Sequence, residues 1–259
     1  MLFLICLWVS LWNNHKKHKG RVRETEEQKI FNLKKISDAH LAVSNTFDHT
    51  ASLLKEIRQS LDVSFDALFD EDVDTLNRQR KKVKQIQVWS NIIMANVFKV
   101  LRLLQKEDPH ISLKYAQTIR RLQKLSDGHR DIVLRSYVHT SNQHKGLLDV
   151  QVEELRKVRI CILDILEKVE NTLNKKKIMD YQNIIDLYQH LRALADQFNK
   201  VQVERIRNDT SKTRLSLLYY AILGNCLMLT KQNIKLLEIF NESFQFDKQL
   251  SKSYYKFDA

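Results

Sequence analysis

The sequence predicts an all-α protein built from long helices. The chain of 259 residues contains 4 glycines and 1 proline, and strand-rich folds of this length need many more turn residues. Apolar residues recur every three to four positions along most of the chain, which is the spacing of one face of an α-helix. Apolar residues make up 43% of the chain, which is enough to fill the core of a helical bundle.

Three helices are predicted in the first half of the chain. The apolar stripe of the first is Val43, Phe47, Ala51, Leu54, Ile57, Leu61, Phe65 and Leu68. Asp70 is expected to cap the second helix, whose stripe is Val83, Ile86, Trp89, Ile93, Val97, Val100 and Leu104. The third is expected to start at Asp108-Pro109, because proline is favoured at the first helical position. Its stripe is Leu113, Ala116, Ile119, Leu122, Leu125, Ile132 and Leu134.

Three more helices are predicted after a polar link. The segment Ser136–Gly146 lacks an apolar period, so we interpret it as the connection between two halves. The fourth helix carries Leu148, Val152, Leu155, Ile162, Leu166, Val169 and Leu173. The fifth carries Ile178, Tyr181, Ile185, Tyr188, Leu191, Leu194, Phe198 and Val201. After a break at 208–211, the sixth carries Leu215, Leu218, Ile222, Cys226, Leu229, Asn233, Leu236 and Phe240. The repeated order of helices indicates a duplicated three-helix unit.

The N-terminal segment combines an apolar run with a basic cluster behind it. The run is too short to cross a bilayer, which takes roughly 20 residues, and a secretory signal would carry its positive charge in front. Charge behind the run suits the cytoplasmic exit of a membrane helix. We therefore expect residues 1–12 to be the end of a transmembrane helix whose beginning is missing; a short apolar anchor or a truncated soluble helix is the alternative. The expected anchoring residues are Leu2, Phe3, Leu4, Ile5, Leu7, Trp8 and Trp12, and the expected membrane-surface basic residues are Lys16, Lys17, Lys19, Arg21 and Arg23.

The remaining positive charge is spread over helix surfaces. The formal net charge is +12, and anionic lipid headgroups are an expected partner. A further basic face, a candidate for contact with a partner, comprises Arg78, Arg80, Lys81, Lys82 and Lys84. Nucleic acid is not expected as a partner, because no basic run is interleaved with stacking aromatics and no zinc-finger spacing occurs.

Residue patterns typical of enzymes are absent from the sequence. It contains no nucleophile motif, no glycine-rich phosphate loop and no HExxH, so we expect neither catalytic residues nor a cofactor. His139 and His144 are interpreted as ordinary residues of a polar link rather than metal ligands. The cysteines Cys6, Cys161 and Cys226 are far apart and odd in number, which indicates free thiols in a reducing compartment.

Two stretches resemble PhoU-like proteins. The stretch VERIRNDTSKTRLSLLYYAILGNCLMLTKQNIKLLEIF, from Val203, resembles the last hairpin of PhoU-type proteins. The stretch SYVHTSNQHKGLL, followed by VQVEELRKV, resembles the cytoplasmic PhoU-like tail of some bacterial inorganic phosphate transporters of the PiT type. The resemblance covers roughly residues 30–245. It implies two tandem three-helix bundles that follow the last membrane helix of a transporter.

The resemblance also implies a function and a division of the chain. The chain would be a cytoplasmic regulatory or accessory domain of an inorganic phosphate transporter at the bacterial inner membrane, with the membrane part of that transporter as partner. A free-standing PhoU-like adaptor that regulates phosphate uptake or signalling is the alternative, and a homodimer is left open. The expected parts are 1–23 (membrane helix end and basic segment), 24–139 and 140–246 (three-helix units), and 247–259 (loose tail).

One departure from the family concerns metal binding. PhoU proteins hold metal clusters through Glu-x-x-x-Asp pairs on the third helix of each unit, a spacing that places both carboxylates on one helix face. Here those positions are Gln123 and Asp127 in the first unit, and Leu227 and Lys231 in the second. An ammonium group repels a cation, so the resemblance implies that the metal site has been lost.

Overall fold

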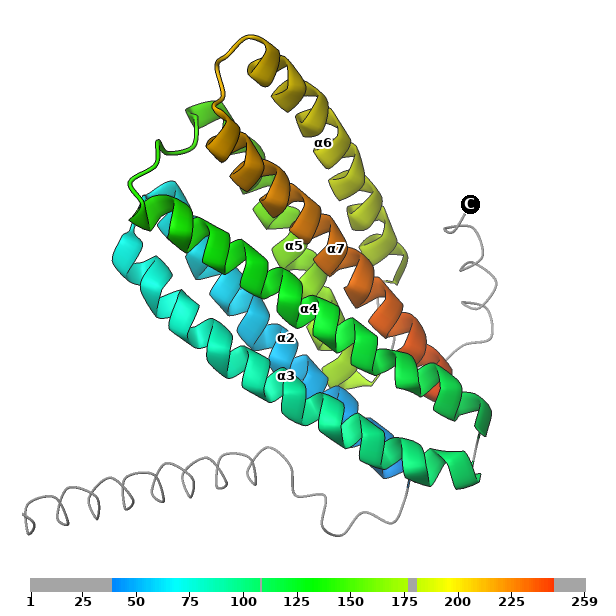
Figure 1. Cartoon of the computed structure of the whole chain (residues 1–259). Helices are drawn as coiled ribbons and strands as arrows, with labels where there is room; N and C mark the ends of the chain where they lie inside the picture. The colour runs from blue at the N-terminus through cyan, green and yellow to red at the C-terminus, as the bar shows by residue number, and fades with distance from the viewer. Residues whose placement is uncertain (1–38, 108, 177–180, 245–259) are drawn as a thin grey trace, which may run out of the picture.

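The described part of the chain is entirely helical. The computed structural model describes residues 39–107, 109–176 and 181–244, which contain six helices and no strand (Figure 1). They are α2 (Ala39–Phe69), α3 (Val73–Glu107), α4 (Pro109–Ser141), α5 (Asp149–Lys175), α6 (Tyr181–Arg207) and α7 (Thr213–Phe244). The predicted all-α class is confirmed. The expected membrane segment and tail lie outside the described residues.

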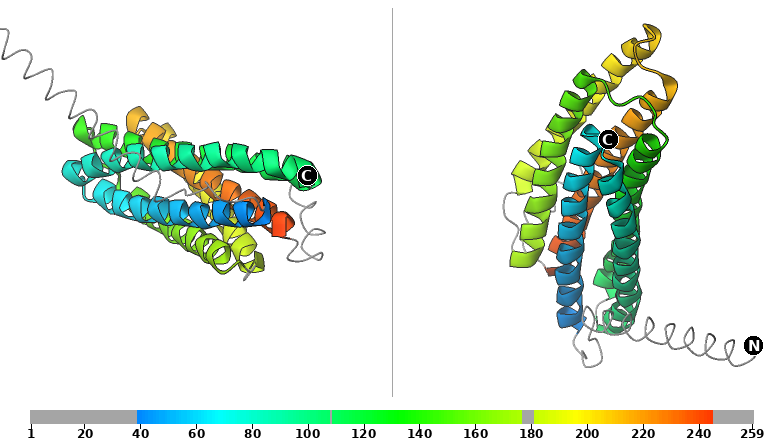
Figure 2. Two further views of the ribbon diagram at one scale, coloured as in Figure 1. Left: turned by 90° about the horizontal axis from the view of Figure 1, so that it is seen from below. Right: turned by 90° about the vertical axis from the view of Figure 1, so that its left-hand side faces the viewer.

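Four of the helices form the centre of the bundle. Helices α2, α4, α5 and α7 pack around a common core, in which α2 contacts α5 and α4 contacts α7. Helix α3 packs on α2 and α4, and α6 packs on α5 and α7, so these two lie on opposite sides (Figure 1). Each half therefore keeps its three-helix order, but the halves share one hydrophobic core. The two further views show the helices running roughly along one direction (Figure 2).

The apolar stripes account for most of this core. Every predicted stripe position of α2 and of α7 is buried. The ring of Phe47 in α2 makes edge contacts with Phe240 of α7, at 4.9 Å between centroids, and with Tyr115 of α4, at 6.3 Å. Such edge-to-face pairs add roughly 0.5–1.5 kcal/mol beyond the burial of apolar area. Aromatic packing thus joins the first half of the bundle to the second.

Several buried hydroxyl groups donate their hydrogen within their own helix. Each donates to the backbone carbonyl four residues earlier, so its hydrogen needs no acceptor on another helix. This is seen for Thr46, Thr50, Ser64, Ser136, Thr140 and Thr230. Serine and threonine therefore take core positions that an apolar pattern does not reveal.

The predicted link at Ser136–Gly146 is wrong in its first part. Helix α4 continues to Ser141, and the connection spans residues 142–148. The side chains of Ser136, His139 and Thr140 are buried in the last turns of α4. Their polar groups are satisfied there, so a polar segment packs as a helix.

The start of α3 and the core face of α4 also differ from expectation. Asp72, not Asp70, caps α3, because the backbone N–H of Thr75 donates to Asp72 Oδ1 at 3.0 Å. In α4, Leu113 was expected in the core, but its side chain is 77% exposed. Tyr115 is fully buried instead, and its hydroxyl donates to Thr46 Oγ1 at 2.7 Å.

Few glycines suffice because other residues end the helices. Glu71, Gln143 and Asp209 follow α2, α4 and α6 with φ of 53°, 53° and 54°, the left-handed conformation that usually falls to glycine. In each case the next residue's N–H bonds a carbonyl in the last turn of the helix, as with Asp72 N to Ala67 O at 2.8 Å. These caps explain how helices within the described residues end although the chain has so little glycine.

Candidate functional site

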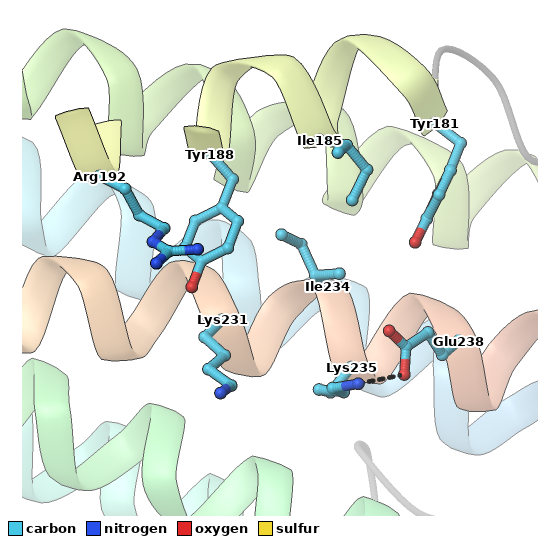
Figure 3. Close-up of a pocket in the computed structure, with 8 residues that line it drawn as sticks. All are labelled: Tyr181, Ile185, Tyr188, Arg192, Lys231, Ile234, Lys235 and Glu238. Carbon is cyan, nitrogen blue, oxygen red and sulfur yellow. Dashed lines mark ion pairs between the residues drawn. The ribbon is translucent and has the colours of Figure 1, made fainter. Parts of the chain in front are cut away.

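A pocket of about 210 Å³ opens between α6 and α7 (Figure 3). Helix α6 contributes Tyr181, Ile185, Tyr188 and Arg192. Their spacing of three to four residues places them on one helical face. Figure 3 shows the two tyrosines and Ile185 projecting from α6 toward α7.

Helix α7 supplies the other wall and most of the charge. Its lining residues are Lys231, Ile234, Lys235 and Glu238. Ile234 points toward α6, whereas Lys231 and Lys235 leave α7 on the other side of the ribbon in this view (Figure 3). The pocket therefore has an apolar centre between the helices and a charged rim.

Positive charge dominates this rim. Lys235 Nζ lies 3.1 Å from Glu238 Oε2, so the one carboxylate of the lining is already paired. Burial raises the pKa of the Glu238 carboxyl, while the positive charges of Lys235 and Arg121 act in the opposite direction. Among the described residues, neither Arg192 nor Lys231 has an ion-pair partner. The Arg192 guanidinium lies 5.9 Å from the centre of the Tyr188 ring. Two unpaired cations thus flank the pocket.

The four positions at which the resemblance to PhoU-like proteins implies a lost metal site lie on two helices that contact each other, α4 and α7. Gln123 and Asp127 lie on α4, and the Asp127 carboxylate pairs with Arg130 at 3.0 Å. On α7, Leu227 is partly buried against the core and Lys231 lines the pocket. Within residues 39–107, 109–176 and 181–244, no three histidine, cysteine or carboxylate side chains are grouped so that they could hold a metal ion. Of Gln123, Asp127, Leu227 and Lys231, only Lys231 lines the pocket between α6 and α7.

The five residues of the predicted basic face of α3 differ in exposure and in their contacts with neighbouring helices. Lys82 pairs with Glu56 of α2 at 2.9 Å, and the Arg80 guanidinium lies 4.4 Å from the centre of the Tyr137 ring of α4. The other three members of this set are exposed, namely Arg78, Lys81 and Lys84. Of the five, only Arg78, Lys81 and Lys84 can bind a partner without losing one of these contacts to a neighbouring helix.

A second basic surface lies where the link meets the start of α7. The rings of His139 and His144 are 5.3 Å apart, and His139 Nε2 is 2.9 Å from the carbonyl oxygen of Lys145. Partial desolvation lowers the pKa of His144, and the positive charge of Arg214 lowers it further. These residues adjoin an open groove that also exposes Val138 and Leu217. The sequence predicts two ordinary residues of a polar link, whereas the structure brings their rings together.

A buried polar network near the same end escaped the sequence analysis. Gln202 of α6 accepts a hydrogen bond from Gln151 Nε2 at 2.9 Å and donates to the hydroxyls of Ser211 and Ser216 at 2.9 and 3.0 Å. The network ties the start of α5 to the turn between α6 and α7. Single polar residues within helical stripes form no sequence motif. The network is therefore evident only when the packing of α5, α6 and the turn before α7 is known.

An ion pair buried beside this network fixes the ends of α5 and α6. Arg205 donates to both oxygens of Glu154, at 2.7 and 2.8 Å, and the hydroxyl of Tyr219 donates to the same carboxylate. The hydrogen bonds that Arg205 donates to Glu154 raise the pKa of Arg205. The arrangement is a structural clamp among three helices, with every charged group satisfied.

The described cysteines are buried thiols. Cys161 and Cys226 are both free, and burial raises the pKa of Cys226 to about 12. A thiol with so high a pKa is a poor nucleophile near neutral pH. Cys6 lies outside the described residues.

Comparisons with known proteins leave the family of this chain open. No family model matches the chain, and none of the curated proteins matches it either. The fold and pocket define a class only: a two-unit helical bundle with a basic pocket between two of its helices. In the part of the chain that the structure describes, none of the helices has the length and apolarity needed to cross a bilayer.

Proposed function

We propose that this chain is a regulatory or accessory helical domain that acts in inorganic phosphate transport at a membrane. The observation that carries the proposal is the helix arrangement. Helices α2–α4 and α5–α7 repeat one three-helix order, which supports the two three-helix units that the PhoU-like resemblance implies. The proposal assigns the chain a role in controlling transport, while the transport step itself belongs to a membrane partner.

The domain would act through contact surfaces. Arg78, Lys81 and Lys84 form an exposed basic set on α3 that suits acidic cytoplasmic loops of a transporter. Contacts between exposed charges weaken as salt is added, because the screening length is about 8 Å at physiological ionic strength. We therefore expect association with the membrane partner to be salt-dependent.

The first test separates a membrane-bound domain from a soluble adaptor. The full chain and a version that starts at Glu24 are expressed in bacteria and fractionated. We expect the full chain in the membrane fraction and the shorter chain in the soluble fraction, because an apolar segment and basic residues together give anchoring. Equal solubility of both versions favours the free-standing adaptor.

The second test addresses regulation. Phosphate uptake and its response to external phosphate are measured in cells that carry the intact gene, a deletion of residues 24–246, or Arg78, Lys81 and Lys84 changed to glutamine. The matched control changes Lys200, exposed on α6, to glutamine. Altered uptake in the deletion and the triple variant, but not in the control, supports the proposal. Unchanged uptake in both contradicts it.

A further inference from the structure

We propose that the pocket between α6 and α7 binds a small phosphate-bearing anion, which Arg192 and Lys231 hold from the two helices. The inference rests on the geometry of the pocket and does not depend on a role in phosphate transport. One of its two cations, Lys231, also occupies a position at which the resemblance to PhoU-like proteins implies a lost metal ligand.

Charge is the first argument. The lining contains three cations and one carboxylate, and the carboxylate of Glu238 is held by Lys235 at 3.1 Å. This leaves Arg192 and Lys231 without ion-pair partners among the described residues. A phosphate monoester carries about −1.5 to −2 charges at pH 7, so it neutralises both cations, whereas a monocarboxylate neutralises one. The unpaired charge therefore favours a dianion.

Donor geometry is the second argument. The guanidinium group of arginine offers a planar fork of N–H donors that matches phosphate oxygens, and a lysine ammonium adds a strong point charge. Arg192 lies over the Tyr188 ring at 5.9 Å, a contact that restrains its position without using up its donors. The two cations come from different helices, so a bound dianion would also link α6 to α7.

The shape of the pocket is the third argument. Its volume of about 210 Å³ is far above the roughly 10–15 Å³ that one water molecule needs, and below the roughly 300–1,000 Å³ of drug-sized sites. Ile185, Ile234 and the Tyr188 ring lie between α6 and α7 (Figure 3). A phosphoryl group at the rim with a small apolar or aromatic group against this centre would use both parts of the pocket.

Binding by the full chain is measured by isothermal titration at constant ionic strength. Three probes are compared: inorganic phosphate, phenyl phosphate and benzoate. We expect phenyl phosphate to bind at least tenfold more tightly than benzoate, because both carry the ring but only the first is a dianion. Inorganic phosphate binding as tightly as phenyl phosphate identifies the free ion as the ligand, and weaker binding identifies a phosphate ester.

Variants link binding to the pocket. R192Q and K231Q should each weaken phenyl phosphate binding at least tenfold, and the double variant should abolish it. Both residues are exposed, so the fold should persist, which circular dichroism checks. The matched control is K200Q, which removes an exposed charge from α6 outside the pocket. No binding by the native chain, or equal binding by the native chain and the double variant, overturns the inference. Neither result changes the membrane fractionation that tests the proposed function.

Discussion

Gly128 of α4 lies directly against Met228 of α7. A Cβ atom on Gly128 would be 2.3 Å from Met228 Cε and 3.2 Å from two side-chain atoms of Leu229. These distances are shorter than ordinary van der Waals contact, so a hydrogen in place of a side chain allows the two helices to approach at this point. Because α4 belongs to the first half and α7 to the second, the contact helps to join the two three-helix groups.

This contact predicts opposite effects for substitutions at two helical glycines. Gly224 lies on α7, and a Cβ atom added to it would have no heavy atom within 4 Å. We expect Gly224→Ala to raise the free energy of unfolding by about 1 kcal/mol, through helix propensity. Gly128→Val should lower it by about 1–3 kcal/mol, because the larger side chain overpacks the α4–α7 contact. Chemical denaturation measures both, and a stabilising Gly128→Val would contradict the close approach.

His129 has one fixed tautomer. The hydroxyl of Ser60 donates its single hydrogen to Gln79 Oε1 at 2.8 Å. His129 Nε2, 2.9 Å from the same hydroxyl oxygen, must therefore be the donor of that pair. The Nδ1 atom is then unprotonated, and it is buried without a hydrogen-bond partner. Burial, together with the positive charge of Lys82, lowers the pKa of His129 to about 3.

The depressed pKa predicts a loss of stability in acid. The unfolded chain binds a proton at His129 below about pH 6.5, whereas the folded chain does not until about pH 3. Stability contributed by the neutral ring is therefore present above pH 6.5 and falls by up to about 1.4 kcal/mol per pH unit below it. His129→Gln should flatten the dependence between pH 7.5 and 5.5, as measured by urea denaturation. Exposed His190→Gln is the control and should leave the slope unchanged.

The Glu154–Arg205 pair predicts a large effect of one substitution and almost none of a neighbouring one. The side chains of Arg205 and Glu154 are 12% and 13% exposed, so removing the arginine leaves a carboxylate buried without its cation. Arg205→Ala should cost about 3–5 kcal/mol. Arg207→Ala, two residues along the same helix, removes a surface pair whose arginine is 69% exposed and should cost under about 1 kcal/mol. Equal losses in thermal or urea denaturation would show that the buried pair is not a clamp.

Metal content is a further prediction. Leu227 and Lys231 stand where the resemblance to PhoU-like proteins implies carboxylates, so we expect no tightly held iron, manganese or zinc. Elemental analysis of the purified full chain measures this directly. One or more ions per chain that disappear in Asp127→Asn would contradict this prediction.

The apolar repeat predicted most of the fold but missed several surfaces. The stripes predicted for α2 and α7 are correct, because every position in them is buried. The end of α4 was missed because Ser136 and Thr140 satisfy their hydroxyls on the helix backbone. Tyr115 was missed because its core position depends on a hydrogen bond to Thr46, a residue on another helix.

The candidate pocket was only partly visible in the sequence. Lys231 was singled out, but as a lost metal ligand, and Tyr188 was assigned to the core, where it is only half-buried. No pattern in the sequence marks Arg192 as a pocket residue. A pocket between two helices depends on which helices are neighbours and on how each is rotated about its own axis. The periodicity of a single helix predicts neither.

Successive described helices run in opposite directions and are even in number, so the two ends of the bundle differ. Helix α2 begins and α7 ends at one of them, while the start of α3 and the surface around Arg214 lie at the other (Figure 1). Helix α2, with 31 residues, is about 46 Å long. A bundle held upright by a tether before Ala39 would keep Arg78 and Arg214 several screening lengths away from lipid headgroups. Those charges would then be out of electrostatic reach of the bilayer, so a transporter loop that contacts them would have to extend along the length of the bundle.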